Sequence, residues 1–305
     1  MSPPSGLVVV DKPGGLTSHD VVGRLRRLLG TRKIGHAGTL DPMATGVLVL
    51  GVERATRLLG HLALDTKAYA ATIRLGVATS TDDAEGEVIA TADAAGVDEA
   101  DVRAGMAALT GAIEQVPSSV SAIKVDGKRA YRRVRDGEQV ELAARPVTVS
   151  EFALDAVHRG AGYTDLDVRV ECSSGTYVRA LARDLGTGLG AGAGVGVGAG
   201  VGGHLTALRR TRVGPFALDT ARTLDELAER PELTHSLEAA LAAAFQVRTA
   251  DPTEAADLSH GRALAAAGID GVYAVTAPDG RALALVSESD GRARPVLVLA
   301  PANAP

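Results

Sequence analysis

Short apolar runs bounded by proline or glycine recur along the first 220 residues of the chain. Residues 6–15 and 46–51 show this pattern, which predicts buried strands. Apolar and polar side chains alternate in residues 66–77, which predicts a strand with one solvent-exposed face. The pattern of residues 165–186 predicts a strand, a glycine turn and then a helix.

Several other segments have helical patterns. Residues 17–20 supply cap residues for an amphipathic helix that continues to about Leu29, and Gly30 is placed to end it. Helices are also predicted at residues 53–63, 98–110 and 221–245. Because the helices do not alternate strictly with the strands, we expect an α+β fold, with a mixed, mostly antiparallel central sheet flanked by helices.

The residue pattern changes near Gln246, from an Ala/Leu-rich helical pattern to strand-like runs. Residues 271–300 contain three strand-like runs separated by two Asp-Gly pairs, and Asp-Gly is a strong hairpin signal. A length of 305 residues favours one large domain and one small one. We therefore predict a large domain at residues 1–247 and a small β-rich domain at residues 248–305.

Composition narrows the class of protein. Cys172 is the single cysteine, which excludes an internal disulfide framework and a cysteine-rich metal site. No apolar span reaches membrane length and no signal peptide is visible, so we expect a cytoplasmic protein with no membrane partner. Residues 186–203 consist of glycine, alanine and valine with few other side chains, which predicts a flexible surface loop.

Charge is unevenly distributed on a chain with a net charge of −5. Basic residues outnumber acidic ones in residues 1–75 and 121–135, whereas residues 217–260 are mainly acidic. A local basic patch can bind phosphates on an acidic protein, because counterion release depends on local contacts. Ordinary solvated faces explain the same charge pattern equally well.

Asp41, in the run GTLDPMATG, is the first candidate for chemistry. Pro42 pushes the Asp41 backbone toward an extended conformation, and glycines bracket the turn just before a buried strand. A turn aspartate that bonds its own backbone is the alternative, and spacing alone favours it. Tyr177 and Arg179 follow at a strand-to-helix junction, where a guanidinium can bind a carboxylate bidentately and favour its ionised form. Tyr69 offers a flat face on which a base can stack.

Five ordered motifs join these candidates. GLVVVDKPGGLTSHDVV, RKIGHAGTLDPMATGVLVLGVERATR, KAYAATIRLGVATSTDDAEGEV, SSGTYVRALARDLG and HLTALRRTRVGPF together resemble the bacterial TruB-type tRNA pseudouridine synthases. The resemblance covers most of residues 6–220, and the C-terminal hairpins are similar to the small PUA-like domain of that family. It implies the pseudouridine synthase fold and modification of uridine 55 in the T arm of tRNA.

The resemblance also assigns roles to residues. It implies that Asp41 is the catalytic aspartate, that Tyr69 stacks on the target base, and that Arg179 pairs with the aspartate. Substrate-binding residues on the same basis are His36, Tyr177, Lys12 and Leu205. No metal or other cofactor is implied, and a monomer that needs no guide RNA or protein partner is expected.

A folded RNA arm must release its target uridine from the stack, so phosphate contacts have to offset that cost. The basic insertion at about residues 119–150 and the run of arginines after residue 208 are the candidates for these contacts. The predicted RNA-binding patch comprises Lys124, Lys128, Arg129, Arg132, Arg133, Arg209, Arg210 and Arg212.

One motif departs from the family and three alternatives stay open. Residues 116–122 read Val-Pro-Ser-Ser-Val-Ser-Ala where the family has Pro-Pro-x-Tyr-Ser-Ala.

An RNA-binding or chaperone protein would need an altered catalytic aspartate, and Asp41 is intact. A glycoside hydrolase would need a second cleft acid. A guide-RNA-dependent relative is the third alternative, and the stand-alone bacterial form is the closer match.

Overall fold

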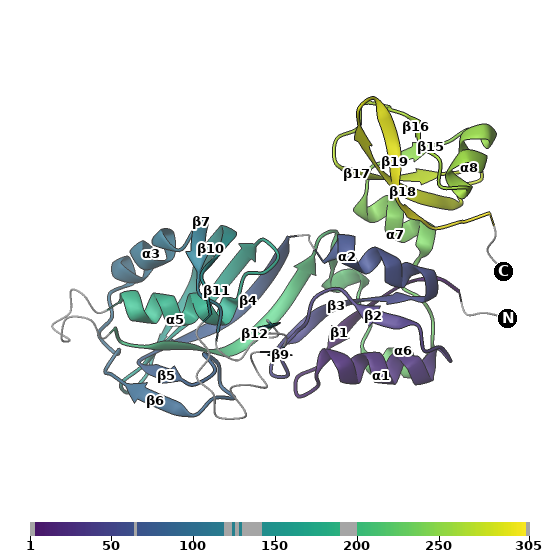
Figure 1. Cartoon of the computed structure of the whole chain (residues 1–305). Helices are drawn as coiled ribbons and strands as arrows, with labels where there is room; N and C mark the ends of the chain where they lie inside the picture. The colour runs from purple at the N-terminus through teal and green to yellow at the C-terminus, as the bar shows by residue number, and fades with distance from the viewer. Residues whose placement is uncertain are drawn as a thin grey trace.

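A ten-stranded sheet runs through the larger part of the molecule (Figure 1). The computed structural model describes residues 4–63, 66–118, 142–189 and 200–302, together with the backbone of Lys124–Val125 and Lys128–Arg129. Eight strands follow the spatial order β14-β1-β3-β12-β4-β11-β10-β7, with β2 paired to β3 and β13 paired to β12. Only the β12–β3 pairing is parallel in this sheet as described, which confirms the mixed, mostly antiparallel sheet.

Four strands of the central sheet, β1, β3, β4 and β11, match the predicted strands, whereas β14 divides the helix predicted at residues 221–245 into α6 (Leu224–Glu229) and α7 (Leu237–Ala244). The bounds of the strands in this sheet are β1 Gly6–Lys12, β2 Ile34–His36, β3 Thr45–Val52, β4 Lys67–Leu75, β7 Gly111–Gln115, β10 Arg145–Arg159, β11 Thr164–Cys172, β12 Gly203–Val213, β13 Phe216–Ala217 and β14 His235–Ser236. Two short ladders lie outside it: β5 Val77–Thr79 with β6 Val88–Thr91, and β8 Lys124–Val125 with β9 Lys128–Arg129.

Helices cover the two faces of the sheet in different ways. The first face carries the larger core, built from the strands and from α1 (Ser18–Leu28), α3 (Glu99–Ala108), α5 (Val178–Gly188) and α6 (Leu224–Glu229). The second face is covered in its β1–β3 half by the 3₁₀ helix η1 (Glu53–Leu58), α2 (Leu59–Leu62) and α7 (Leu237–Ala244). Figure 1 shows α3 and α5 at one end of the sheet and α1 and α6 at the other.

Strand alternation explains which side chains reach the first face. Along β4 the buried positions are Lys67, Tyr69, Ala71, Ile73 and Leu75, at every second residue. Directly paired residues on neighbouring strands share a face, so Tyr69 of β4 and its partner Arg210 of β12 both point to the first face. This pairing brings the two side chains under the loop that carries Asp41.

Gly46 allows β3 to pair closely with β12. Its φ is +99°, and a Cβ at this position would lie 2.2 Å from the carbonyl oxygen of Arg210. Only glycine accepts both the left-handed backbone and this close approach to β12. The parallel pairing of β3 with β12, next to the candidate site, therefore depends on the glycine that ends GTLDPMATG.

A second, five-stranded sheet forms the C-terminal part of the chain. Its strands lie in the order β15-β17-β18-β19-β16, and α8 (Pro252–Ser259) packs on it. Asp290-Gly291 links β18 to β19 with positive φ at both residues, as the Asp-Gly hairpin signal predicted. The strand bounds are β15 Val247–Thr249, β16 Leu264–Ala265, β17 Val272–Thr276, β18 Ala282–Ser289 and β19 Arg292–Val298.

The glycine-rich segment differs from its prediction at both ends. Residues 186–188 belong to α5 and Gly203 begins β12, so these ends are not a surface loop. A Cβ on Gly186 would lie 2.3 Å from the backbone carbon of Gly202, which means that glycine allows α5 to pack directly on the start of β12. Residues 190–199, the middle of the predicted loop, lie outside the described residues.

Most of the basic insertion also lies outside the described residues. Arg132 and Arg133 are among the undescribed positions, and for Lys124, Lys128 and Arg129 only the backbone is described. Among the helices that the structure describes, none is both long enough and apolar enough to span a membrane.

Candidate active site

Asp41 lies in a loop that is fixed on both sides by hydrogen bonds. Ser18, the first residue of α1, accepts a hydrogen bond from the Leu40 amide at 2.9 Å and donates to the Leu40 carbonyl at 3.2 Å. After Asp41, the Pro42 carbonyl accepts a bond from the Gly15 amide at 2.8 Å. The backbone on each side of Asp41 is therefore held, which fixes the origin of its side chain.

Lys12, at the end of β1, also holds the loop that carries Asp41. Its side chain is fully buried, and its ammonium donates to the carbonyls of Pro13, Leu16 and Pro42 at 2.9, 2.7 and 3.2 Å. Burial lowers the pKa of Lys12 to about 8, and the negative charge of Asp41 raises it in part. This geometry makes Lys12 a positioning residue for the Asp41 loop.

Arg179 and Asp41 form a two-point ion pair. Nε of Arg179 lies 3.0 Å from one Asp41 carboxylate oxygen, and Nη2 lies 3.3 Å from the other. The Arg179 side chain is 5% exposed whereas that of Asp41 is 34% exposed. A buried guanidinium thus orients an accessible carboxylate, which is the contact that the sequence predicted.

Asp83 is a second acid on the same arginine. Its carboxylate lies 3.5 Å from Nε of Arg179, and its side chain is 4% exposed. Thr81 also holds the arginine, since its carbonyl accepts from Nη1 at 2.8 Å. Asp83 is too buried to serve as the second cleft acid of a glycoside hydrolase, and it supports the orientation of Arg179 instead.

Glu85 lies at the open side of this cluster. Burial raises the pKa of its carboxyl group, and the negative charges of Asp83 and Asp41 raise it further. Three carboxylates therefore surround Arg179 and Lys12, so the site concentrates negative charge around two fixed cations.

Tyr69 approaches Asp41 from the sheet below. Its side chain is 8% exposed, and burial raises the pKa of its hydroxyl, while a hydrogen bond from Arg210 acts in the opposite direction. Asp41 is close enough to add to the upward shift of that pKa. The ring and the carboxylate thus belong to one site, at the centre of the first face.

Two other predicted residues lie around this centre. Tyr177 is the extended N-cap of α5, and Gln115 clamps it, with the Gln115 side chain accepting from the Tyr177 amide at 2.8 Å and donating to its carbonyl at 3.1 Å. α5 starts at Val178, so Tyr177 is the last extended residue before the helix, whereas Arg179 lies in the first turn of the helix. His36 ends β2 and is partly exposed, on the same side of that strand as the core residue Ile34.

Leu205 is a core residue. It is fully buried in the larger core, and its amide donates to the Asp82 carbonyl at 3.0 Å. The structure thus places Leu205, predicted to bind substrate, inside the core. Its contact with the Asp82 backbone instead holds the segment that carries Asp83.

The three β12 arginines of the predicted RNA-binding patch do not share one face of the sheet. Arg210 is 1% exposed and donates to the carbonyls of Val47, Gly38 and Thr39, so it supports the loop before Asp41. Arg209 and Arg212 pair with Ala70 and Ala68 of β4, and therefore point to the face opposite Tyr69. Acids occupy both: Asp11 lies 2.6 Å from Arg209, and Glu171 lies 2.7 Å from Arg212.

Sequence reasoning missed four residues of the site: Ser18, Asp83, Glu85 and Gln115. Ser18 stood among the predicted cap residues, but Thr17 is the N-cap and Ser18 faces Leu40. Asp83 and Glu85 lie within TSTDDAEG, a segment that carried the family resemblance without any of its three acids being singled out. Across the described residues, no group of three histidine, cysteine or acidic side chains is arranged to hold a metal ion.

Comparison with known proteins defines the class. The family model described as "TruB family pseudouridylate synthase (N terminal domain)" matches residues 26–178. A second model, "tRNA Pseudouridine synthase II, C terminal", matches residues 245–300. The Asp41 loop and its sheet thus belong to a pseudouridine synthase.

Relatives make the assignment more specific. The chain is 64% identical over 301 residues to "tRNA pseudouridine synthase B" of Nocardia farcinica, covering 99% of this chain and 95% of the relative. It is 61% identical over 299 residues to the protein of that name from Rhodococcus jostii, covering 98% and 95%. The chain belongs to the TruB family, in its bacterial form.

A solved structure has the same fold. A Cbf5-Nop10-Gar1 complex matches with a TM-score of 0.71 and 25% identity, over 97% of this chain and 85% of the matched chain. The pseudouridine synthase fold predicted from the motifs is therefore confirmed.

Proposed function

We propose that this chain isomerises uridine 55 to pseudouridine in the T arm of tRNA, with Asp41 as the catalytic carboxylate. The observation that carries the proposal is the two-point Arg179–Asp41 pair, in which the arginine is buried and the aspartate is accessible. Curated relatives that share about three fifths of their residues with the chain are named tRNA pseudouridine synthases, which supports the substrate.

The reaction needs an oriented anion in a confined site. The N1–C1′ bond of uridine breaks, the uracil turns, a C5–C1′ bond forms, and C5 loses its proton while N1 gains one. Asp41 begins this sequence by attack at C1′, by attack at C6 or by removal of the C2′ proton. Each route requires an ionised carboxylate with a fixed direction, which the Arg179 guanidinium favours.

Tyr69 and His36 serve the nucleotide while it reacts. Tyr69 lies on the same face as Asp41, and its ring provides a surface on which the detached uracil stays stacked as it turns. Because burial keeps the Tyr69 hydroxyl protonated, the residue acts through its ring and its hydroxyl hydrogen bond rather than as an anion. His36, at the end of β2, contacts the RNA at the edge of the site, and Tyr177 lines the pocket.

Recognition of the folded arm requires further contacts. Extrusion of the target base costs a few kcal/mol, which phosphate contacts elsewhere on the protein offset. We assign residues 1–247 to catalysis and residues 248–305 to a PUA-like RNA-binding domain, and we expect a cytoplasmic monomer that works without a guide RNA or a protein partner. The second sheet and the family match at residues 245–300 support this division.

An unmodified tRNA transcript tests the proposal directly. Incubation with the full-length chain, followed by mapping of pseudouridine, is expected to give product at position 55 alone. A transcript with cytidine at that position serves as the matched control and is expected to give none. Product at a different uridine, or no product, contradicts the proposal.

A further inference from the structure

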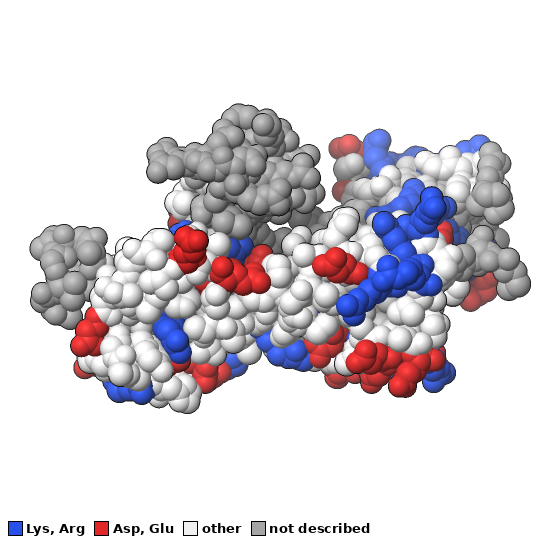
Figure 2. All heavy atoms as spheres, turned by 90° about the horizontal axis from the view of Figure 1, so that it is seen from below, with Lys and Arg blue, Asp and Glu red and all other residues white. Residues whose placement is uncertain are grey.

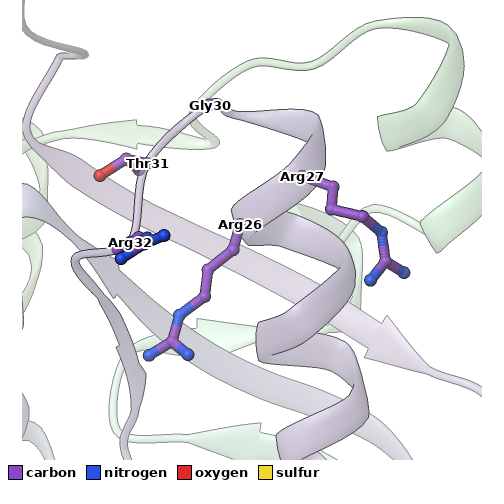
Figure 3. Close-up of a pocket in the computed structure, with 5 residues that line it drawn as sticks. All are labelled: Arg26, Arg27, Gly30, Thr31 and Arg32. Atoms are coloured by element: carbon purple, nitrogen blue, oxygen red, sulfur yellow. The ribbon is translucent and has the colours of Figure 1, made fainter.

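Three arginines surround a hollow at the end of α1, on the side of the molecule away from the second sheet. Arg26 and Arg27 lie in the last turn of the helix, and Arg32 follows it. Together with Gly30 and Thr31 they line a cavity of about 550 Å³. Figure 3 shows Arg26 and Arg32 beside each other at the helix end and Arg27 extending from the other side of the helix. We call these three residues the α1 arginine cluster.

The turn after α1 builds this arrangement. Gly30 adopts a φ of +64°, which reverses the chain, and the Thr31 amide donates to the Arg26 carbonyl at 3.2 Å. Nη2 of Arg26 donates to the Ile34 carbonyl at 3.1 Å, which ties the helix end to β2. The turn therefore places Arg32 beside the C-terminal end of α1 (Figure 3).

Among the described residues, no acid forms an ion pair with the α1 arginine cluster. Glu53 is the neighbouring carboxylate, and it accepts from Thr31 and lies 3.6 Å from Lys33. Within the described part of the chain, none of the three arginines has a carboxylate within ion-pair distance. Figure 2 shows basic side chains gathered over the half of the molecule that contains α1.

The helix that carries the cluster packs on the same face of the sheet as Asp41. α1 packs on the first face of the sheet, and its first residue, Ser18, holds Leu40 next to Asp41. From Arg32 the chain reaches His36 in four residues, which span at most about 14 Å. The cluster therefore lies a short chain distance from His36, on the helix whose first residue holds the Asp41 loop.

A structural role for the helix end does not account for all three residues. Cations in the last turn of a helix interact favourably with its C-terminal carbonyls, which explains Arg26 and Arg27. Arg32 lies beyond the helix, and Thr31 and Gly30 already complete the turn. Three exposed arginines that line one hollow have the chemistry of an RNA phosphate site, because each guanidinium presents several donors to phosphate oxygens.

We propose that the α1 arginine cluster binds backbone phosphates of the RNA strand that flanks the nucleotide held at Asp41. This proposal rests on the proposed function, since it takes RNA as the substrate. It replaces the β12 arginines, which are buried or acid-paired, as the phosphate contact on the described residues of the catalytic domain.

Equilibrium binding of the unmodified tRNA transcript over a range of salt concentrations tests the cluster. Arg26 is left intact because it bonds the Ile34 carbonyl. The full-length double variant Arg27→Gln/Arg32→Gln is expected to weaken binding about tenfold, raise KM in parallel, and reduce the slope of log Kd against log salt by about 1 to 2. The matched control, Arg103→Gln/Arg230→Gln, removes two exposed arginines that are paired to Glu99 and Glu232, and is expected to bind within about twofold of the wild type.

A charge-retaining variant decides between phosphate binding and misfolding. Arg27→Lys/Arg32→Lys keeps two cations that bind phosphate as point charges, so most of the affinity and of the salt slope is expected to remain. Loss of binding in both the Gln and the Lys variants, or a Gln variant that behaves like the control, overturns the proposal. If the wild type binds the transcript without forming pseudouridine, the proposed function fails, and the difference in salt slope still decides the cluster.

Discussion

Arginines take opposite forms in two regions of this protein. At Asp41 a single buried arginine is held by two carboxylates and a backbone carbonyl, so its position is fixed before any substrate arrives. At the end of α1, three exposed arginines face solvent with no acid partner among the described residues. The first arrangement suits chemistry that needs an oriented charge, and the second suits a flexible polyanion.

The energetics of the two regions differ as well. Removing one member of a buried ion pair leaves an uncompensated charge and costs about 3–5 kcal/mol, whereas an exposed pair contributes about 0–1 kcal/mol. Substitutions at Arg179 are therefore expected to change both folding and rate. Substitutions in the α1 arginine cluster are expected to change RNA affinity and leave the fold intact.

Among the residues that hold Asp41, Arg179 gives the largest expected effect. Arg179→Met leaves Asp41 and Asp83 without their common cation, so kcat is expected to fall at least about 100-fold and the unfolding temperature to drop. Arg179→Lys keeps the charge but loses the fork that binds both Asp41 oxygens, and an intermediate kcat is expected. Single-turnover kinetics and thermal unfolding check both, and a wild-type kcat in Arg179→Met contradicts the role.

Asp83, the second carboxylate on Arg179, tests whether fixing the arginine affects the rate rather than RNA binding. Asp83→Asn preserves the shape of the side chain but removes one of the two carboxylates that fix Arg179, so kcat is expected to fall about tenfold. RNA affinity is expected to change by less than about twofold, because the residue is buried away from solvent. An effect confined to Kd would show that Asp83 acts on binding and not on the Arg179–Asp41 pair.

Lys12 has the smallest expected effect, and pH reveals it. Its pKa is lowered from 10.5 to about 8 in the folded chain, so between these values the unfolded chain binds more protons. The free energy of unfolding therefore rises with pH in this window, by about 1 kcal/mol from pH 8 to 9, relative to Lys12→Met. Urea unfolding of both proteins at each pH measures the difference, and a constant difference would contradict the lowered pKa.

The sequence predicted the elements better than their faces. Apolar runs gave β1, β3 and β4 nearly to the residue, and the family motifs joined Asp41 to Arg179 across the chain. The faces of the β12 arginines could not be predicted, because they depend on a register shift between Arg210 and Arg212 that no local pattern reveals. The burial of Lys12 could not be predicted for a similar reason, because it depends on three carbonyls that only the folded loop brings together.

The rate of Asp41→Asn on bound RNA tests the central claim most directly. Asparagine keeps the size of the side chain and removes the charge that Arg179 orients. In single turnover, with unmodified tRNA fully bound, pseudouridine formation is expected to fall at least about 1000-fold while Kd stays within about twofold of the wild type. A rate within tenfold of the wild type would contradict the assignment of Asp41 as the catalytic carboxylate.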